Sequence, residues 1–193
     1  MLCGEVVKLI KKIYHHLYYI VLRKLFLNSL YKSASQESTV VVFDIDNTLS
    51  KTRASETVDF CSSLPRHENM CLIAEYFCSR VNYNVFFLSV RPLRFLNDTR
   101  VWLKKNINSP EKHSVFFTKT PQQKIDLLHS LNLQSRVIFF DDMSYGSFGN
   151  VRFFDSVIDA IDESKIIHLG LDFIDESSSN SIDNSLQKIL DAC

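Results

Sequence analysis

Pairs of acidic side chains follow two separate apolar runs of this sequence. Asp44 and Asp46 come directly after the first run, and Asp141 and Asp142 come directly after the second. If both runs are strands of one parallel sheet, their carboxyl ends lie at the same edge and the four carboxylates meet there. Carboxylates at close range repel unless a cation neutralises them, and oxygen ligands favour a hard ion such as Mg²⁺. The sequence therefore predicts a magnesium site with Asp44 and Asp142 as ligands, and with Asp141 as a third ligand or as a support for them.

The same acids suit phosphoryl transfer. A bound cation lets a phosphate approach an anionic nucleophile, and the carboxylate of Asp44 can attack phosphorus to form an aspartyl-phosphate. Asp46, two residues on, can protonate the leaving oxygen and then deprotonate the attacking water. Ser89, at the end of another apolar run, can donate a hydrogen bond to a phosphate oxygen. A lysine nearby can offset the charge of the transition state.

Two lysines, Lys119 and Lys124, precede the apolar run that ends before Asp141. Pro121 suits the first turn of a helix, so a helix should begin there and place Lys124 in its opening turn. Lys119 falls in the preceding loop, where a solvated side chain is the ordinary outcome. We predict that Lys124 completes the site and leave Lys119 as the alternative.

The elements that must position these residues alternate along the chain. Apolar runs typical of buried strands lie at 40–43, 85–88, 115–117, 137–140, 151–154 and 166–169. Helical patterns lie at 5–31, 68–80, 92–106, 121–131, around Asp159 and at 182–190, while 32–38 and 175–181 are expected to be irregular. Continuous apolar strands separated by helices indicate a mostly parallel α/β sheet with helices on both faces.

Four motifs carry a resemblance to a known family. DxDxT begins at Asp44, a strand ends in Ser89, Lys124 stands before an apolar helix face, and Asp141 and Asp142 close an apolar strand. This order and spacing resemble the haloacid-dehalogenase (HAD) superfamily of phosphatases. The resemblance implies a Rossmann-like fold, Mg²⁺ and hydrolysis of a phosphate monoester through an aspartyl-phosphate.

The resemblance also extends the expected site. It implies that the backbone carbonyl of Asp46 is a further metal ligand, and we expect Thr48, Ser89 and Arg91 to contact the substrate. Only residues 50–67 are spare between the first two motifs, so we expect a flap there and no large cap domain. The phosphorylated substrate is not identified by these residues. A phosphotransferase and a non-catalytic phosphate-recognising or scaffold module stay open as alternatives.

Charge is unevenly spread along the chain. Residues 1–36 contain six Lys/Arg and one acid, a net charge of +5, so the remainder carries −5 because the whole chain is neutral. The basic amphipathic helix predicted at 5–31 suits an anionic membrane surface or a partner helix, with packing on its own domain as the alternative. The acidic remainder argues against a nucleic-acid partner but leaves one open.

We expect three parts: a helix and linker at 1–36, a HAD-like catalytic domain at 37–174, and a C-terminal tail at 175–193. A helix within this tail is left as an open alternative. The five cysteines are an odd number and include no CxxC, so we read them as reduced thiols rather than as a zinc or disulfide framework. The longest strongly apolar run near the start is too short to span a bilayer. A cytoplasmic location follows as the expectation, with peripheral membrane attachment open.

Overall fold

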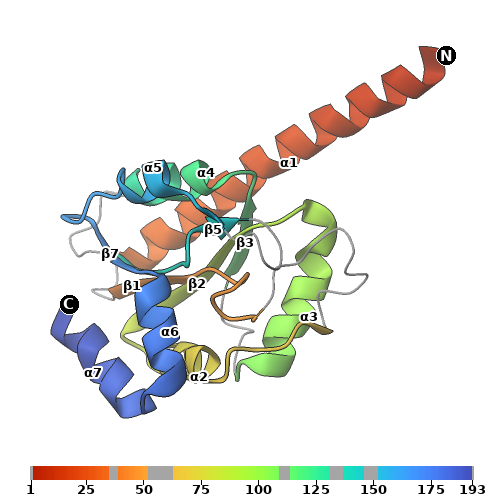
Figure 1. The fold of residues 1–193 in the computed structure, drawn as a ribbon. Coiled ribbons are helices and arrows are strands. Elements are labelled where there is room, and N and C mark those ends of the chain that lie inside the picture. The colour runs from red at the N-terminus through yellow and green to blue at the C-terminus, as the bar shows by residue number, and fades with distance from the viewer. Residues whose placement is uncertain are drawn as a thin grey trace.

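A five-stranded parallel sheet forms the centre of the computed structural model, which describes residues 2–34, 39–51, 63–108, 114–130, 137–145 and 152–192 (Figure 1). The strands are β1 Thr39–Phe43, β2 Tyr83–Val90, β3 Ser114–Thr118, β4 Val137–Phe140 and β7 Ile166–Leu169. Their order is β3-β2-β1-β4-β7, and every neighbouring pair is parallel. The predicted fold class is therefore confirmed, and the described residues contain no cap domain.

Alternate residues of the strands point to opposite faces of the sheet, and a layer of helices covers each face. One face packs against α1 Leu2–Ala34, α4 Pro121–His129 and α5 Asp155–Ile158. The other packs against α2 Glu68–Cys78, α3 Leu96–Asn106, α6 Leu171–Ser179 and α7 Ile182–Ala192. The two layers lie above and below the sheet in Figure 1. Burial on both faces explains why the central strands are apolar throughout.

Aromatic side chains fill the core on the α2 face. The rings of Phe43 in β1 and Phe140 in β4 stack with their centroids 4.4 Å apart. Trp102 of α3 is buried, and its Nε1 donates a hydrogen bond to the carbonyl of Leu64 at 2.7 Å. This core fixes the two strands that end in the acidic pairs.

Three predicted elements that follow the N-terminal helix differ from the structure. The predicted strand at 151–154 does not join the main sheet: β6 Arg152–Phe153 pairs antiparallel with β5 Ser144–Tyr145. The helix predicted from Pro92 begins with a 3₁₀ turn, η2 Leu93–Phe95. Residues 175–179, expected to be irregular, belong to α6. There the burial of Ile174 and Ser177 outweighs the weak helix propensity of the serines.

The N-terminal helix α1 is longer than the predicted helix and also takes up the start of the predicted linker; residues 35–38 lie outside the described part of the chain. Its C-terminal half packs on the sheet through Leu22 and Phe26, while its N-terminal half projects away from the body (Figure 1). Within the described residues, no helix is both long and apolar enough to cross a bilayer.

Candidate active site

The loop after β1 presents two carboxylates at the carboxyl edge of the sheet. The backbone N–H of Asp44 donates to the carbonyl of Phe140 at 2.8 Å, which extends the pairing of β1 with β4 by one residue. The carbonyl of Ile45 then accepts hydrogen bonds from the N–H groups of Leu49 (3.1 Å) and Ser50 (2.8 Å). These bonds close a tight loop that includes Asp46.

Asn47 supplies the sharp bend in this loop. Its φ of 60° lies in the left-handed region, which asparagine tolerates better than most residues. Its Nδ2 lies 3.0 Å from Ser144 Oγ and 3.4 Å from Asp142 Oδ2. The next residue, Thr48, is fully buried, and its Oγ1 accepts a hydrogen bond from the N–H of Asp142 at 3.3 Å. Asn47 and Thr48 therefore tie the first acidic segment to the second.

The second acidic segment follows β4 and is held from its other side. The N–H of Asp141 donates to the carbonyl of Leu169 at 3.3 Å, and Nε2 of His168 donates to the carbonyl of Asp141 at 2.8 Å. The Oδ1 of Asp141 accepts a hydrogen bond from the N–H of Met143 at 2.8 Å. The Asp141 side chain is thus fixed before any ligand binds.

Lys124 lies among these carboxylates. Helix α4 begins at Pro121, and the side chain of its N-cap Thr120 accepts a hydrogen bond from the N–H of Gln123. Lys124 follows in the first turn, with its Nζ 2.7 Å from Asp44 Oδ1 and 2.5 Å from Asp141 Oδ2.

Lys119 lies elsewhere, with its Nζ 3.3 Å from His16 Nδ1 and 5.0 Å from the centre of the Tyr19 ring. Of the two lysines, the structure brings Lys124 to the acidic site.

Arg91 binds the second acid of the loop. Its Nε and Nη2 lie 2.9 and 2.7 Å from the two carboxylate oxygens of Asp46, and its Nη1 lies 2.7 Å from Thr99 Oγ1. The guanidinium is thus held in a bidentate ion pair, a geometry that arginine forms and lysine does not. Arg91 is only 2% exposed.

A small cavity of about 50 Å³ opens onto the site. It is lined by Asp44, Asp46, Ser89, Val90, Pro121, Lys124, Asp141, Met143, Ser144 and Phe154. The predicted nucleophile, acid/base, serine and lysine therefore face one space. Thr48 and Arg91, which we expected to contact the substrate, are not among the lining residues. Their contacts instead hold Asp142 and Asp46 in place.

The buried charges of the site do not balance. Four carboxylates, Asp44, Asp46, Asp141 and Asp142, are accompanied by two cations, and all six residues are at most 4% exposed. With every group ionised, the cluster carries a net charge of −2, because Arg91 and Lys124 offset only two of the four acids. Such a charge is costly in a buried site unless a cation or protons neutralise it.

The pKa of Asp44 reflects this imbalance. Burial is the largest cause that raises its pKa; Lys124 lowers it, Asp141, Asp46 and Asp142 raise it again, and the outcome is about 7. Burial alone would lower the pKa of Lys124, but its attraction to Asp141 and Asp44 raises that pKa above the usual value, so Lys124 stays charged. The excess negative charge of the cluster therefore contributes to the raised pKa of Asp44.

Three of the acids form a set that could hold a metal ion. One carboxylate oxygen each of Asp44, Asp141 and Asp142 lies within 4.8 Å of the others. An all-oxygen set with a residual charge of −2 fits a hard divalent cation. The side chain of Asp46 is bound by Arg91 and does not belong to this set. Of the four predicted ligands, Asp44, Asp141 and Asp142 therefore have carboxylates close enough to share an ion.

The ends of the expected flap at 50–67 are joined. The N–H of Lys51 donates to the carbonyl of Pro65 at 2.8 Å, and the N–H of His67 donates to the carbonyl of Leu49 at 2.7 Å. Residues 52–62 lie outside the described part of the chain. The described ends of this segment are therefore held side by side, next to the loop that carries Asp46.

Sequence reasoning missed three supporting residues: Asn47, Thr99 and His168. Asn47 had a signal, because asparagine inside a DxDN loop is a common source of a left-handed bend. Thr99 and His168 had none, since their contacts with Arg91 and Asp141 depend on how distant elements pack.

The sequence matches no known protein-family model, and it matches none of the curated proteins with which it was compared. The protein has a parallel α/β fold with a buried aspartate cluster at the carboxyl edge of its sheet, an arrangement compatible with a HAD-like fold.

Proposed function

We propose that the protein is a HAD-type, Mg²⁺-dependent phosphohydrolase that cleaves a phosphate monoester. One observation carries the proposal: Asp44 faces the cavity together with Asp46, Ser89 and Lys124, and it also belongs to the carboxylate set that could hold a cation. A carboxylate that shares a cation with its neighbours and opens onto a polar cavity is suited to attack phosphorus.

In the proposed reaction, a carboxylate oxygen of Asp44 bonds to phosphorus as the bond to the leaving oxygen breaks. Asp46 delivers a proton to that oxygen, and the released alcohol departs. Asp46 then takes a proton from water, which attacks the phosphorus, breaks its bond to Asp44 and releases phosphate. A bound Mg²⁺ would supply positive charge against the phosphate oxygens and the carboxylates.

Lys124 and Ser89 would act during both steps. The ammonium group of Lys124 is fixed between Asp44 and Asp141, where it can also approach an oxygen of the transferring phosphoryl group. A buried cation held in position costs no reorganisation as negative charge develops. Ser89 Oγ lies 3.4 Å from Asp46 Oδ2 at the cavity wall, from which it can donate to a phosphate oxygen.

The test is phosphate release from a panel of phosphate monoesters, including p-nitrophenyl phosphate, with Mg²⁺ and with EDTA. We expect release only with Mg²⁺, and a loss of at least about 10³-fold in Asp44→Asn, since the amide keeps the volume but removes the nucleophile. Asp159→Asn, at an exposed position, is the matched control and should keep wild-type activity.

Three results would count against the proposal. Turnover by Asp44→Asn close to the wild-type rate would show that Asp44 is not the nucleophile. Binding of phosphate esters without any turnover would favour a recognition module. Consumption of the ester without a matching release of inorganic phosphate, when an alcohol acceptor is added, would identify a phosphotransferase instead.

A further inference from the structure

Exposed hydrophobic side chains gather on one helix. Ten of the fourteen large hydrophobic residues that are exposed in the described part of the chain belong to α1. They are Val6, Val7, Leu9, Ile10, Ile13, Tyr14, Leu17, Ile20, Val21 and Leu25. Single exposed hydrophobic residues are ordinary, but a contiguous apolar patch marks an interaction site.

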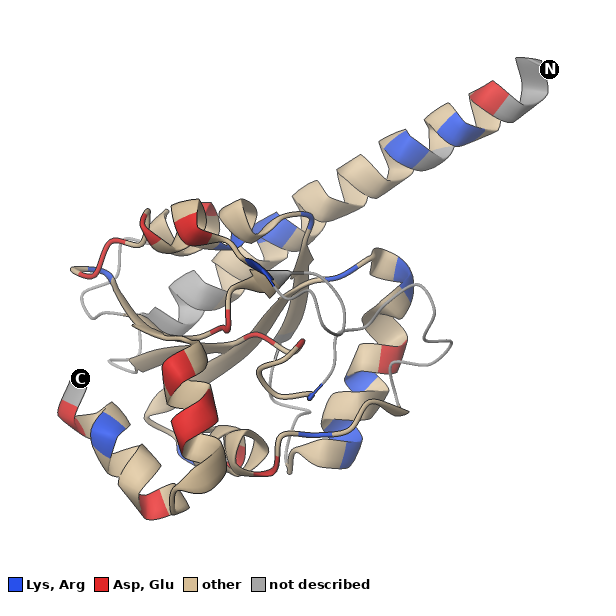
Figure 2. Cartoon of the chain, viewed as in Figure 1, with Lys and Arg blue, Asp and Glu red and all other residues tan. Residues whose placement is uncertain are grey.

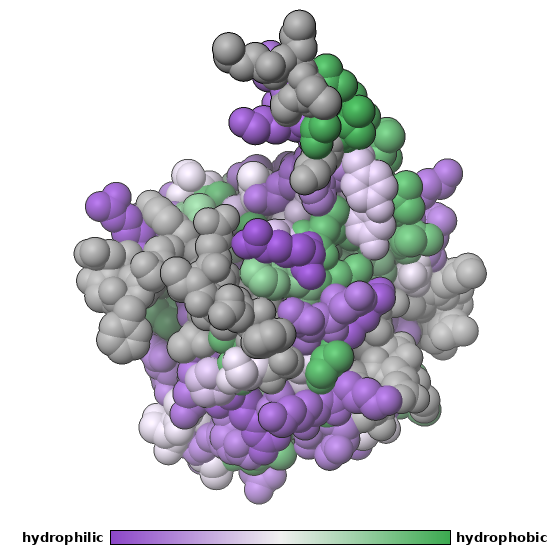
Figure 3. Space-filling model, turned by 90° about the vertical axis from the view of Figure 1, so that its right-hand side faces the viewer, coloured by the Kyte–Doolittle hydropathy of each residue, from purple (hydrophilic) through white to green (hydrophobic). Residues whose placement is uncertain are grey.

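This face points away from the body of the protein. Leu22 and Phe26 pack α1 on the sheet, and on a helical wheel they lie nearly opposite Ile10, Ile13 and Leu17. Figure 3 shows hydrophobic side chains along the projecting part of the helix. The contact with the sheet therefore does not cover the apolar face that the sequence pattern predicts.

The charge of the helix indicates what kind of surface would cover it. The described side chains of Lys8, Lys12, Arg23 and Lys24 are exposed, and Glu5 is the single acid of α1. Figure 2 shows basic segments along the helix, with acidic colour only near its N-terminal end. A second copy would present the same cationic helix and repel it. An anionic surface attracts these cations. Lys24 lies on the same side of the helical wheel as Val6, beyond the end of the apolar face, and the charges of Lys8, Lys12 and Arg23, which lie off that side, still come within about one Debye length of the surface, roughly 8–10 Å.

The length of the apolar face suits a helix that lies along the surface of a lipid bilayer. From Val6 to Leu25 the apolar face extends about 28 Å at the usual helical rise, yet no described helix can cross a membrane. A basic amphipathic helix that does not span a bilayer lies in its interface. Tyr14 and Tyr18, which stack with their ring centres 6.3 Å apart, are residues that favour that interface.

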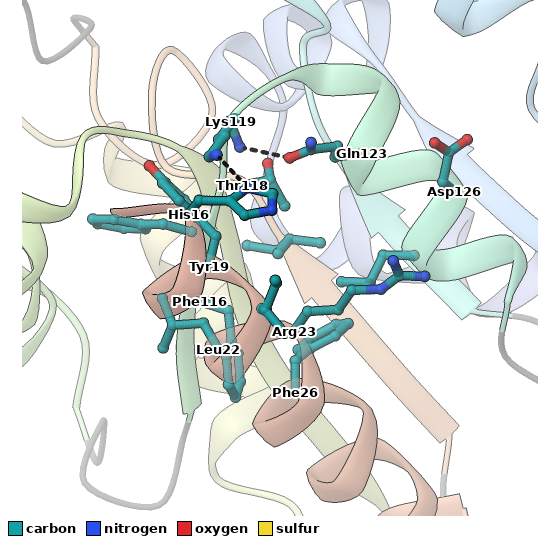
Figure 4. Close-up of a pocket in the computed structure, with 14 residues that line it drawn as sticks. His16, Tyr19, Leu22, Arg23, Phe26, Phe116, Thr118, Lys119, Gln123 and Asp126 are labelled. Carbon is teal, nitrogen blue, oxygen red and sulfur yellow. Dashed lines mark hydrogen bonds between the residues drawn. The ribbon is translucent and has the colours of Figure 1, made fainter. Parts of the chain in front are cut away.

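A cavity beside the helix combines apolar walls with basic side chains, as the helix itself does. It measures about 200 Å³ and lies between α1, β3 and α4, with Phe26 and Phe116 among its apolar walls and His16 and Lys119 at its polar end (Figure 4). Ile20 belongs both to this cavity and to the exposed apolar face. Ile20 therefore joins the outer apolar face of α1 to a cavity whose lining includes the cations Arg23 and Lys119 and the acid Asp126. This apolar cavity with a net positive charge matches the chemistry of an anionic lipid.

We propose that α1 seats the protein on an anionic lipid bilayer through the face formed by Val6, Leu9, Ile10, Ile13, Leu17, Ile20 and Val21. The helix lies in the plane of the interface, with its apolar face toward the acyl chains and its lysines near the headgroups. This inference does not depend on the catalytic proposal, since its test measures binding alone.

The experiment is co-sedimentation of the full chain with vesicles of phosphatidylcholine mixed with phosphatidylglycerol, and with vesicles of phosphatidylcholine alone. We expect binding to the mixed vesicles, weakened by salt, and little binding to the neutral ones. Ile10→Gln/Ile13→Gln should bind at least about tenfold more weakly, because two apolar side chains leave the interface. Lys8→Gln/Lys12→Gln should bind more weakly and depend less on salt.

Val101→Gln is the matched control, since Val101 is 57% exposed on α3, close to the 60% of Ile10. It should bind as the wild type does, and all variants should keep the wild-type melting temperature. Three results would overturn the proposal. They are no binding to mixed vesicles at low salt, unchanged binding by Ile10→Gln/Ile13→Gln, or a lipid-free dimer that this double variant converts to a monomer, which would assign the face to a second copy.

Discussion

Replacing Asp44 by asparagine should stabilise the metal-free protein while it abolishes activity. The carboxylate of Asp44 lies in a buried cluster with an excess charge of −2, and its pKa is raised to about 7 from an ordinary value of 3.8. Burial is the largest cause of this rise. The folded protein therefore disfavours the ionised form of Asp44 relative to the unfolded chain, and a neutral amide of the same size removes that cost.

The size of the effect follows from the pKa. A difference of about three pKa units corresponds to about 4 kcal/mol at 1.36 kcal/mol for each unit, which is an upper limit because water and side chains relax around a charge. We expect Asp44→Asn to gain about 1–3 kcal/mol in free energy of unfolding at pH 8. Because the folded pKa of Asp44 is higher than its unfolded pKa, the contribution of Asp44 to the stability of the wild type is fully present below about pH 4 and is lost as the pH rises through 7.

Urea unfolding of both proteins in EDTA, between pH 4 and pH 8, measures this difference. The two curves should coincide near pH 4 and separate as the pH rises. Mg²⁺ should raise the melting temperature of the wild type far more at pH 8 than at pH 5, since the cation replaces the proton. If Asp44→Asn were less stable than the wild type at pH 8 without metal, the charge imbalance inferred for this cluster would be wrong.

Four further substitutions separate the roles of the other residues. Lys124→Met should lose activity and about 3–5 kcal/mol of stability, because it leaves buried carboxylates unpaired. Lys119→Met should change activity and stability little. Activity assays and melting temperatures measure both effects, and the reverse result would assign the site to Lys119. Asp142→Asn should weaken Mg²⁺ binding at least about tenfold in calorimetric titration. An unchanged affinity for Mg²⁺ would show that Asp142 is not a metal ligand. Arg91→Lys should lower kcat about 10- to 100-fold with little change in KM, since lysine cannot hold Asp46 through two bonds. A raised KM with kcat preserved would instead show that Arg91 binds the substrate.

The placement of the acids and of Lys124 could be predicted from local features. The continuous apolar runs ending at Phe43 and Phe140 identified two buried strands, and the acids that follow them had to meet at one edge of a parallel sheet. Pro121 fixed the start of α4 and therefore the position of Lys124. These are features in which a residue and its neighbours in sequence decide the outcome.

Features that depend on packing between distant elements were not predictable. The long side chain of Arg91 could have pointed to solvent, to substrate or to Asp46, and the choice depends on how α3 brings Thr99 beside it. The pattern of α1 defined its apolar face correctly, but it could not show that two residues off that face, Leu22 and Phe26, make the contact with the sheet. The helix at 171–179 is likewise stabilised by burial rather than by its own sequence.

The contacts of Asp46 lead to a last prediction, about which esters the proposed phosphohydrolase cleaves. Both of its carboxylate oxygens accept hydrogen bonds from Arg91, at 2.9 and 2.7 Å. A carboxyl group that donates a proton must use one oxygen as a donor, so this arrangement suits the step that takes a proton from water better than the step that protonates the leaving oxygen.

Leaving groups that depart without a proton should therefore react fastest. We expect kcat/KM to rise steeply as the pKa of the leaving alcohol falls, with aryl phosphates cleaved at least about tenfold faster than alkyl phosphates of similar size. The measurement is a series of substituted phenyl and alkyl phosphates assayed at one pH, repeated with Arg91→Lys. In that variant Asp46 loses one of its two bonds, so the dependence on the leaving group should become shallower. Equal rates across the wild-type series would mean that Asp46 donates its proton readily, and the bond to Arg91 would then have to break during each turnover.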